Sequence, residues 1–143
     1  MEYFIYCDGG SRGNPGPSGS GAVIFKNKEI ISQISEYIGV QTNNYAEYSS
    51  LLFSLQECIK LGINETKIEI FMDSKLVVEQ VNKRWKVKSD NIKTLYSQIM
   101  ELLKTFSNTS ISHIPRKLNS IADSLANKAM NTSENYLKKY QLI

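Results

Sequence analysis

The alternation of hydrophobic and polar positions along the chain predicts five β-strands and four helices. Strands are indicated where aromatic and β-branched residues gather or alternate with polar ones, over residues 3–7, 20–27, 30–38, 67–72 and 109–114. Helices are indicated where apolar side chains recur every three or four positions, over residues 44–61, 74–83, 91–105 and 120–130. Residues 133–143 are expected to add a short helix or a tail.

The order of these elements predicts how the strands join. The short link Asn27-Lys28-Glu29 between the second and third strands is typical of antiparallel neighbours, whereas strands that follow a helix join a sheet in parallel. We therefore expect an α/β fold: a mixed five-stranded sheet, with three antiparallel strands and then parallel strands, flanked by helices. A chain of 143 residues is the length of one domain, here residues 1–143.

Composition excludes several classes of protein. Seventeen Lys and Arg against fourteen Asp and Glu give a net charge of +3, too mild an excess to indicate a nucleic-acid partner by itself. The chain has no apolar run of about 18 residues and no secretory leader, so we expect no membrane partner and a cytoplasmic location. Two cysteines without a CxxC spacing, Cys7 and Cys58, and a single histidine exclude a disulfide scaffold and a zinc ribbon. Both cysteines are expected in the core.

Six of the eight glycines fall between positions 9 and 21, together with Pro15 and Pro17. This composition predicts a turn-rich loop. The segment lacks the G-x-x-x-x-G-K-[ST] pattern of a P-loop. It also leads into a predicted strand rather than a helix, which excludes a dinucleotide-binding turn.

Acidic side chains stand at the ends of four predicted elements: Asp8, Glu47, Asp73 and Asp123. Each has an ordinary structural interpretation, namely an Asp-Gly turn for Asp8, a capping box with Asn44 for Glu47, an N-cap for Asp73 and a capping box with Ser120 for Asp123. Together they favour chemistry, because sites in α/β sheets gather at strand ends. Carboxylates that converge there repel one another, and two Mg²⁺ ions about 3.5–4 Å apart would relieve that repulsion.

Four segments in this order, YCDGGSRGNPGP, TNNYAEYSSL, FMDSKLVV and PRKLNSIADSLAN, resemble type 1 ribonuclease H. The resemblance runs from about residue 2 to residue 130. Only Arg84-Trp85-Lys86-Val87-Lys88 links two predicted helices, so the chain is most similar to the compact archaeal and bacterial members that lack a basic protrusion.

The resemblance implies an endonuclease that hydrolyses the RNA strand of RNA/DNA hybrids by a two-metal mechanism, leaving 5′-phosphate and 3′-hydroxyl ends. Mg²⁺ is the implied cofactor and Mn²⁺ an alternative. Asp8 would bridge both metals, and Asp73 would help to orient the attacking water. Glu47 would bind the metal on the leaving-group side, and Asp123 the other metal.

The resemblance also implies substrate-binding residues. Asn14, Asn43 and Asn44 match positions that contact the minor groove, where 2′-hydroxyls mark an RNA strand. The ordinary interpretation of Asn14 is a turn residue, and that of Asn43 a helix N-cap. Three further residues match positions beside them: Thr42 and Ser74 near the backbone, and Lys75 where the family often has glutamine.

Residues 75–93 hold six cations and two acids around Trp85. Basic and aromatic side chains together suit a phosphate–sugar track, which favours binding of the DNA strand. The alternative is a solvated linker in which Trp85 caps the core. Ser89 stands where the family often has a phosphate-binding asparagine; it is also a good N-cap for the next helix.

Many members of the family carry a histidine in a flexible loop near the site. His113 precedes Asp123 by the usual ten residues, but it is predicted inside a strand, and the loop after it is short. Compact members have an arginine or lysine instead, so we expect Arg116 or Lys117 near the site.

Three other functions are weighed. A hybrid-binding or double-stranded-RNA-binding module would lack a carboxylate, and all four are present. The nuclease domain of a reverse transcriptase would be attached to a polymerase, whereas this sequence begins at Met1, so a free and monomeric enzyme is favoured. A two-carboxylate glycosidase would have an aromatic sugar cleft rather than asparagines. Activity on double-stranded RNA stays open.

Overall fold

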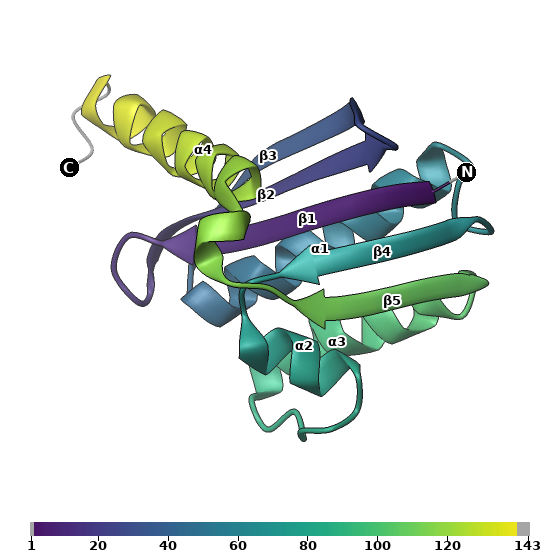
Figure 1. The fold of residues 1–143 in the computed structure, drawn as a ribbon. Helices are drawn as coiled ribbons and strands as arrows, with labels where there is room; N and C mark the ends of the chain where they lie inside the picture. Colours follow the sequence, from purple (N-terminus) through teal and green to yellow (C-terminus); the bar gives the residue numbers. More distant parts are fainter. Residues whose placement is uncertain (1, 140–143) are drawn as a thin grey trace.

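The computed structural model describes residues 2–139, with side chains up to residue 132. Its five strands form one mixed sheet in the order β3-β2-β1-β4-β5 (Figure 1). The predicted α/β fold is confirmed. The elements are β1 Glu2–Ser11, β2 Gly16–Lys26, β3 Glu29–Gln41, α1 Asn43–Lys60, β4 Lys67–Met72, α2 Lys75–Val81, α3 Asp90–Leu103, β5 Asn108–His113, the short 3₁₀ turn η1 Arg116–Leu118 and α4 Ser120–Lys139.

The helices lie on both faces of the sheet. Helices α1, α2 and α3 cover one face, and α4 crosses the other face over β1, β2 and β3 (Figure 1). The main core lies between the sheet and α1, where alternate strand residues meet one stripe of the helix. Its fully buried side chains include Cys7 and Cys58, as predicted, and the large residues Ile5, Ile70, Met72, Tyr48, Leu51 and Leu55.

The sheet brings the carboxyl ends of β1 and β4 to one edge. β1 is antiparallel to β2 and parallel to β4, with Cys7 opposite Met72. Asp8 and Asp73 follow these two residues directly, so they emerge side by side. This is the convergence that the order of predicted elements implied.

The prediction of a turn-rich loop over the glycines is wrong for most of that segment. β1 runs on to Ser11 and β2 begins at Gly16, so only residues 12–15 turn. Asp8 lies inside β1, opposite Gly21, and not in a turn. The glycines instead let helices approach: a Cβ on Gly9 would lie 2.3 Å from the main chain of α1, and one on Gly21 2.3 Å from that of α4.

The N-cap of α1 is not one of the predicted residues. Thr42 is the N-cap, and its hydroxyl accepts a hydrogen bond from the Tyr45 amide at 3.2 Å. Neither Asn43 nor Asn44 is therefore the cap. Glu47 lies five residues after the cap, where it takes no part in a capping box.

The ordinary interpretations of the other two acids are also wrong. Ser74 is the N-cap of α2, so Asp73 lies outside the helix with no capping role. Ser120 lies inside α4, whose Asp123 amide donates to the carbonyl of Asn119 at 3.1 Å, so Ser120 and Asp123 form no capping box.

Helix α4 is longer than predicted. It runs without a break from Ser120 to Lys139, so residues 133–139 continue the helix rather than form a separate one. The rest of the predicted tail, residues 140–143, lies outside the described residues. None of the helices among residues 2–139 is long and apolar enough to cross a membrane.

The close contact between β2 and α4 predicts the cost of filling a glycine. In Gly21→Ala the new methyl would lie 2.3 Å from the Ala122 carbonyl oxygen, so the backbone of α4 must move, at a cost of about 2 kcal/mol or more. In Gly10→Ala it meets only the flexible end of Met130, at 3.2 Å, and the loss should be smaller. Urea unfolding of both variants measures the difference; equal losses would contradict this account of the packing.

Candidate active site

Four carboxylates converge at the edge of the sheet, from β1, α1, α4 and the link between β4 and α2. Oxygens of Asp8, Glu47 and Asp73 all lie within 4.8 Å of one another. Asp123, from the first turn of α4, lies beside Asp8 and contributes to the rise of the Asp8 pKa. A polar pocket of about 480 Å³ opens over Asp8, Glu47 and Asp123.

Close packing of α1 on β1 brings Glu47 to Asp8. A Cβ on Gly9 would lie 2.5 Å from the amide nitrogen of Glu47, so only glycine permits this approach. The Gly9 amide donates to the Asp8 carboxylate at 2.9 Å, and the buried Ser20 hydroxyl donates to the Ala46 carbonyl at 2.7 Å. These contacts fix the start of α1 over the end of β1.

A buried amide brings Asp123 to the same place. Asn119, which is 1% exposed, donates from Nδ2 to the Cys7 carbonyl at 2.8 Å. This bond ties the beginning of α4 to the residue before Asp8. Asp123 follows one helical turn later and lines the same pocket as Asp8 and Glu47.

Burial, with repulsion from neighbouring acids, raises the pKa of two of these carboxyl groups. Burial is the main cause for Asp8, whose pKa lies well above the ordinary 3.8; the charge of Asp73 and contacts with Asp123 add to it. Burial also raises the pKa of Glu47 from 4.5 to about 7, partly opposed by a hydrogen bond from Ser74. The cluster therefore resists holding all its negative charges without a counter-charge.

The donor set fits a hard divalent cation. All the candidate ligand atoms are carboxylate oxygens, which Mg²⁺ and Mn²⁺ prefer. Within the described part of the chain, this is the one group of three or more such side chains close enough to share a metal. The raised pKa of Asp8 is the second sign of fit, because a cation would remove the repulsion that causes part of it.

Two of the predicted groove asparagines are linked in a chain of hydrogen bonds. The Ser11 amide donates to Asn43 Oδ1 at 2.8 Å, and the Asn43 amide donates to Asn14 Oδ1 at 3.1 Å. Both amide oxygens thus accept from the backbone, so each side chain offers a ligand chiefly its NH₂ donors. Asn43 and Asn44 line the carboxylate pocket, and Thr42 caps the helix beneath them.

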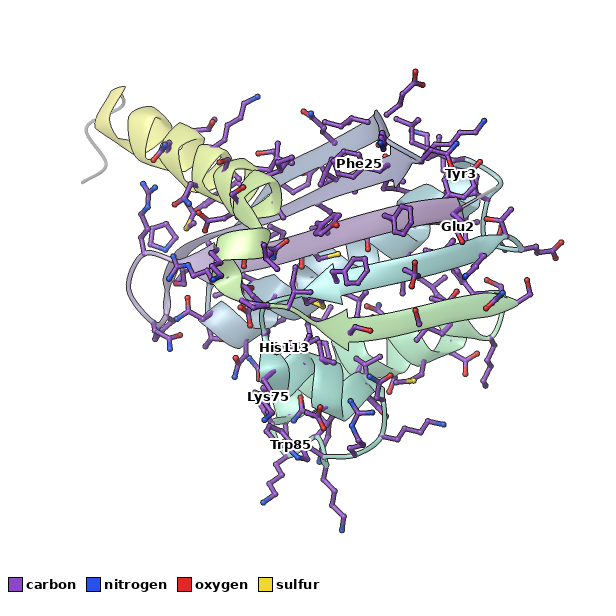
Figure 2. The ribbon with its side chains drawn as sticks, viewed as in Figure 1. Glu2, Tyr3, Phe25, Lys75, Trp85 and His113 are labelled. Atoms are coloured by element: carbon purple, nitrogen blue, oxygen red, sulfur yellow. The ribbon has the colours of Figure 1, made fainter. Side chains whose placement is uncertain are left out.

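Lys75 and Trp85 lie together on the opposite flank of the site. Lys75 is the first residue of α2, and its Nζ is 6.0 Å from the centroid of the Trp85 ring (Figure 2). Trp85 is 45% exposed and stands outside the core, so the interpretation that it caps the core is wrong. With Lys86, Lys88 and Ser89 it lines a hollow of about 570 Å³.

The link between α2 and α3 is folded by an ion pair. Arg84 donates twice to the Glu79 carboxylate, at 2.7 and 2.9 Å, and its amide donates to the Glu79 carbonyl. Arg84 is therefore engaged within the turn that presents Trp85. Ser89 is the N-cap of α3, in agreement with its alternative interpretation. Its hydroxyl makes no capping bond to a backbone amide and donates instead to the side chain of Asn91.

The structure separates the three basic candidates for the loop position. Arg116 lines the carboxylate pocket, with Nη2 3.9 Å from Asp123 Oδ1. Lys117 is exposed on the same turn and does not line this pocket. His113 belongs to β5, as predicted, and is the last residue of that strand; Figure 2 shows it on the side of α2.

Sequence reasoning missed Arg12 and Asn127, which line the far end of the pocket. Arg12 Nη2 donates to Asn127 Oδ1 at 3.4 Å. The available signals were the position of Arg12 two residues before Asn14, and that of Asn127 one helical turn after Asp123. Neither is specific without the fold, because the partners are 115 residues apart.

Comparison with known proteins identifies the family. The sequence pattern of the "Reverse transcriptase-like" family matches residues 6–129. Ribonuclease HI of Helicobacter pylori is 33% identical over 137 residues, which cover 88% of this chain and 91% of that protein. The chain belongs to the type 1 ribonuclease H family.

Solved structures of family members superpose closely. The LC11-RNase H1 structure in complex with an RNA/DNA hybrid has a TM-score of 0.87 and 38% identity, covering 92% of this chain and 98% of that one. The N-terminal RNase H domain of Rv2228c from Mycobacterium tuberculosis has a TM-score of 0.86 and 44% identity, covering 91% and 99%. The chain spans 36% of the length of the full Rv2228c protein, described as bifunctional.

The raised pKa values predict how stability depends on pH without metal. Folded Asp8 and Glu47 keep protons that the unfolded chain releases, so the free energy of unfolding should fall as the pH rises from about 4 through the raised pKa values, about 7 for Glu47. The shift at Glu47 alone should account for a loss on the order of 3 kcal/mol. Asp8→Asn should flatten this fall, and Mg²⁺ should offset it in the wild type.

Urea unfolding between pH 4 and pH 9, in chelator and in Mg²⁺, measures this effect. Stability of the chelated wild type that stays level or rises over the range would contradict the repulsion described here. Glu101→Gln, at an exposed acid paired with Lys104, is the control.

Proposed function

We propose that this chain is an endoribonuclease that hydrolyses the RNA strand of RNA/DNA hybrids with the help of divalent metal ions. The observation that supports it most is the meeting of Asp8, Glu47, Asp73 and Asp123 at one edge of the sheet, in a chain of the ribonuclease H family. The named relatives agree: ribonuclease HI of Halobacterium salinarum is 38% identical over 127 residues. The structure of LC11-RNase H1 in complex with an RNA/DNA hybrid supports such a hybrid as the substrate.

In the proposed mechanism the four carboxylates would hold two Mg²⁺ ions, with Mn²⁺ as an alternative. When bound, such ions supply a nucleophile at neutral pH and stabilise the charge that develops on the leaving oxygen. Asp8, at the centre of the cluster, would help to hold both ions. Asp73 and Asp123 would hold the ion on the side of the attacking water, and Glu47 the ion on the side of the leaving group. The products carry 5′-phosphate and 3′-hydroxyl ends.

The chain's own residues keep this site prepared. The Gly9 amide and Asn119 hold Asp8 and the start of α4 before substrate arrives, which limits reorganisation during the reaction. Arg116, 3.9 Å from Asp123, places a positive charge at the pocket wall that helps to receive a phosphate and to release product. This is the role in which it replaces the loop histidine, with Lys117 as the second candidate.

Recognition of the RNA strand follows from the hydrogen-bond polarity of the asparagines. Because Asn14 and Asn43 use their oxygens on the backbone, their NH₂ groups donate to minor-groove acceptors and 2′-oxygens. Asn44 completes this row, and Thr42 and Ser74 lie near the backbone of the strand. A B-form DNA duplex offers no 2′-hydroxyl at these positions.

The DNA strand is proposed to follow Lys75 and Trp85. An exposed indole beside cations suits stacking against a sugar or base next to a phosphate track. At this strand a hybrid differs from double-stranded RNA only in its deoxyribose sugars. The contact with Trp85 therefore separates the two duplexes only if it depends on the sugar, and weak activity on double-stranded RNA is compatible with the proposal. We further propose that residues 1–143 form one ribonuclease H domain, and that the enzyme acts in the cytoplasm as a monomer.

A cleavage assay tests the proposed substrate. With Mg²⁺ or Mn²⁺ the protein should cut internally in the RNA strand of a labelled hybrid, and leave single-stranded RNA and duplex DNA intact. Asp73→Asn should lower the rate at least about 100-fold, because it removes a charge that holds the metals. Gel analysis of the labelled strands measures both. Binding of the hybrid without cleavage of any substrate would favour a binding module instead.

A binding assay tests the proposed contact of Trp85 with the DNA strand. Trp85→Ala should weaken hybrid binding about tenfold, because base stacking on an aromatic ring contributes about 1–3 kcal/mol. Leu61→Ala, at an exposed apolar residue at the far end of α1, is the matched control. Fluorescence anisotropy in the Asp73→Asn background measures affinity without turnover. Equal affinities of the two variants would show that the DNA strand does not contact Trp85.

A further inference from the structure

A buried pair of side chains joins helix α1 to the link between α2 and α3, residues 82–89. Tyr48 of α1 is fully buried, and its hydroxyl lies 2.5 Å from Oε1 of Gln80, which belongs to α2 and is 7% exposed. Nε2 of Gln80 donates in turn to the main-chain carbonyl of Lys86 at 2.9 Å. Two consecutive hydrogen bonds therefore run from α1 to the link.

The last member of the pair's chain of hydrogen bonds fixes their direction. A carbonyl oxygen only accepts, so the NH₂ group of Gln80 must face Lys86 and its oxygen must face Tyr48. The Tyr48 hydroxyl is thus the donor, and burial raises its pKa above the ordinary value, which keeps the proton on it. The two side chains satisfy each other and the link, as buried polar groups must.

Few other contacts hold the second half of the link. Among the described residues, no other hydrogen bond reaches residues 86–88. Val87 packs against the core, whereas Lys86 and Lys88 are exposed. The turn that begins the link is held separately, by its own backbone hydrogen bonds to α2. The bond from Gln80 therefore fixes the segment that carries both lysines.

The buried pair lies between the proposed contacts of the two strands of a duplex. Exposed side chains of the link line one hollow of about 570 Å³, the surface proposed for the DNA strand: Trp85, Lys86 and Lys88. At the other end of the pair, α1 begins with Asn43 and carries Glu47, which are proposed to act on the RNA strand. The pair thus ties the two surfaces together inside the protein.

We propose that Tyr48 and Gln80 are positioning residues for the DNA strand, which hold residues 85–88 at a fixed place relative to α1, so that one duplex reaches both sets of contacts. This inference rests on the proposed function. Both residues act through the link. A surface that is ordered before the duplex binds lowers the cost of ordering it on binding.

Binding of an RNA/DNA hybrid in the Asp73→Asn background, measured by fluorescence anisotropy, tests this role. Tyr48→Phe should weaken binding about threefold and Gln80→Met about fivefold, because they remove one and two neutral hydrogen bonds. Combining the two changes should add little to Gln80→Met, because Tyr48 acts through Gln80. Both effects should largely disappear when Trp85 and Lys88 are replaced by alanine, because few contacts are then left to position.

The fluorescence of Trp85 gives a signal that a general loss of stability would not change. Trp85 is the single tryptophan of the chain. In free Tyr48→Phe and Gln80→Met, acrylamide should quench its emission more strongly than in the wild type, because the link opens more easily. Ile24→Val, which removes one methylene from the fully buried core at β2, is the control for stability and should leave both quenching and binding unchanged.

Steady-state kinetics on the otherwise wild-type chain separate positioning from catalysis. Tyr48→Phe and Gln80→Met should raise KM by about the factors found for binding and leave kcat within about twofold, because neither change touches the carboxylates. Thermal unfolding checks that every variant is folded at the assay temperature.

The outcomes distinguish this inference from the proposed function. If the wild type does not cut the RNA strand, the proposed function is wrong, and the inference that rests on it falls too. If the wild type cuts, and both variants bind the hybrid as the wild type or Ile24→Val does, the inference alone is wrong. Unchanged quenching of Trp85 would also overturn it. So would a fall in kcat with KM unchanged, because the pair would then support the carboxylates and not the link.

Discussion

Electrostatic repulsion among four carboxylates is the constraint on which this structure turns. Bringing Asp8, Glu47, Asp73 and Asp123 together costs free energy, as the raised pKa values of Asp8 and Glu47 express. The folded chain withstands this cost through contacts that do not depend on the acids. Buried glycines admit α1 and α4 to the sheet, and Asn119 ties α4 to the end of β1. The carboxylate site thus lowers the stability of the fold when no cations are bound to it.

The surroundings of the acids divide into two flanks with different chemistry. On one flank, the β1–β2 turn and the start of α1 join Asn14 and Asn43 in a fixed row of amides. On the other, the turn after α2 presents Trp85 with Lys75. Each flank is held by hydrogen bonds within the protein, so a double-stranded ligand meets a surface that is already shaped.

Much of this arrangement could be predicted from the sequence. The antiparallel and parallel joining of the strands followed from the links between them, and the parallel pairing of β1 with β4 places Asp8 beside Asp73. These strand pairings follow from the chain connectivity, which local sequence patterns predict well. The positions of Glu47 and Asp123 in the first turns of predicted helices marked them as candidates, and the family resemblance added their roles and the row of asparagines.

The errors have a common cause in tertiary packing. The glycines between residues 9 and 21 look like turn residues locally, but most of them are strand positions against which helices pack closely. The sequence predicts caps at Asn44, Asp73 and Ser120 because each is a good capping residue. Thr42 and Ser74 cap the first two helices instead, which leaves Glu47 and Asp73 to the site. Arg12 and Asn127 meet only in the fold, so no local pattern could pair them.

The central claim is that the four carboxylates hold two metal ions at the RNA strand. Co-crystals of Asp123→Asn with a short RNA/DNA hybrid and Mn²⁺ would test it most directly, through the anomalous signal of manganese. The account predicts Mn²⁺ peaks among Asp8, Glu47 and Asp73, about 3.5–4 Å apart where both are occupied, with an RNA phosphodiester against them. A bound hybrid with no manganese at these carboxylates, or with its DNA strand over them, would contradict it.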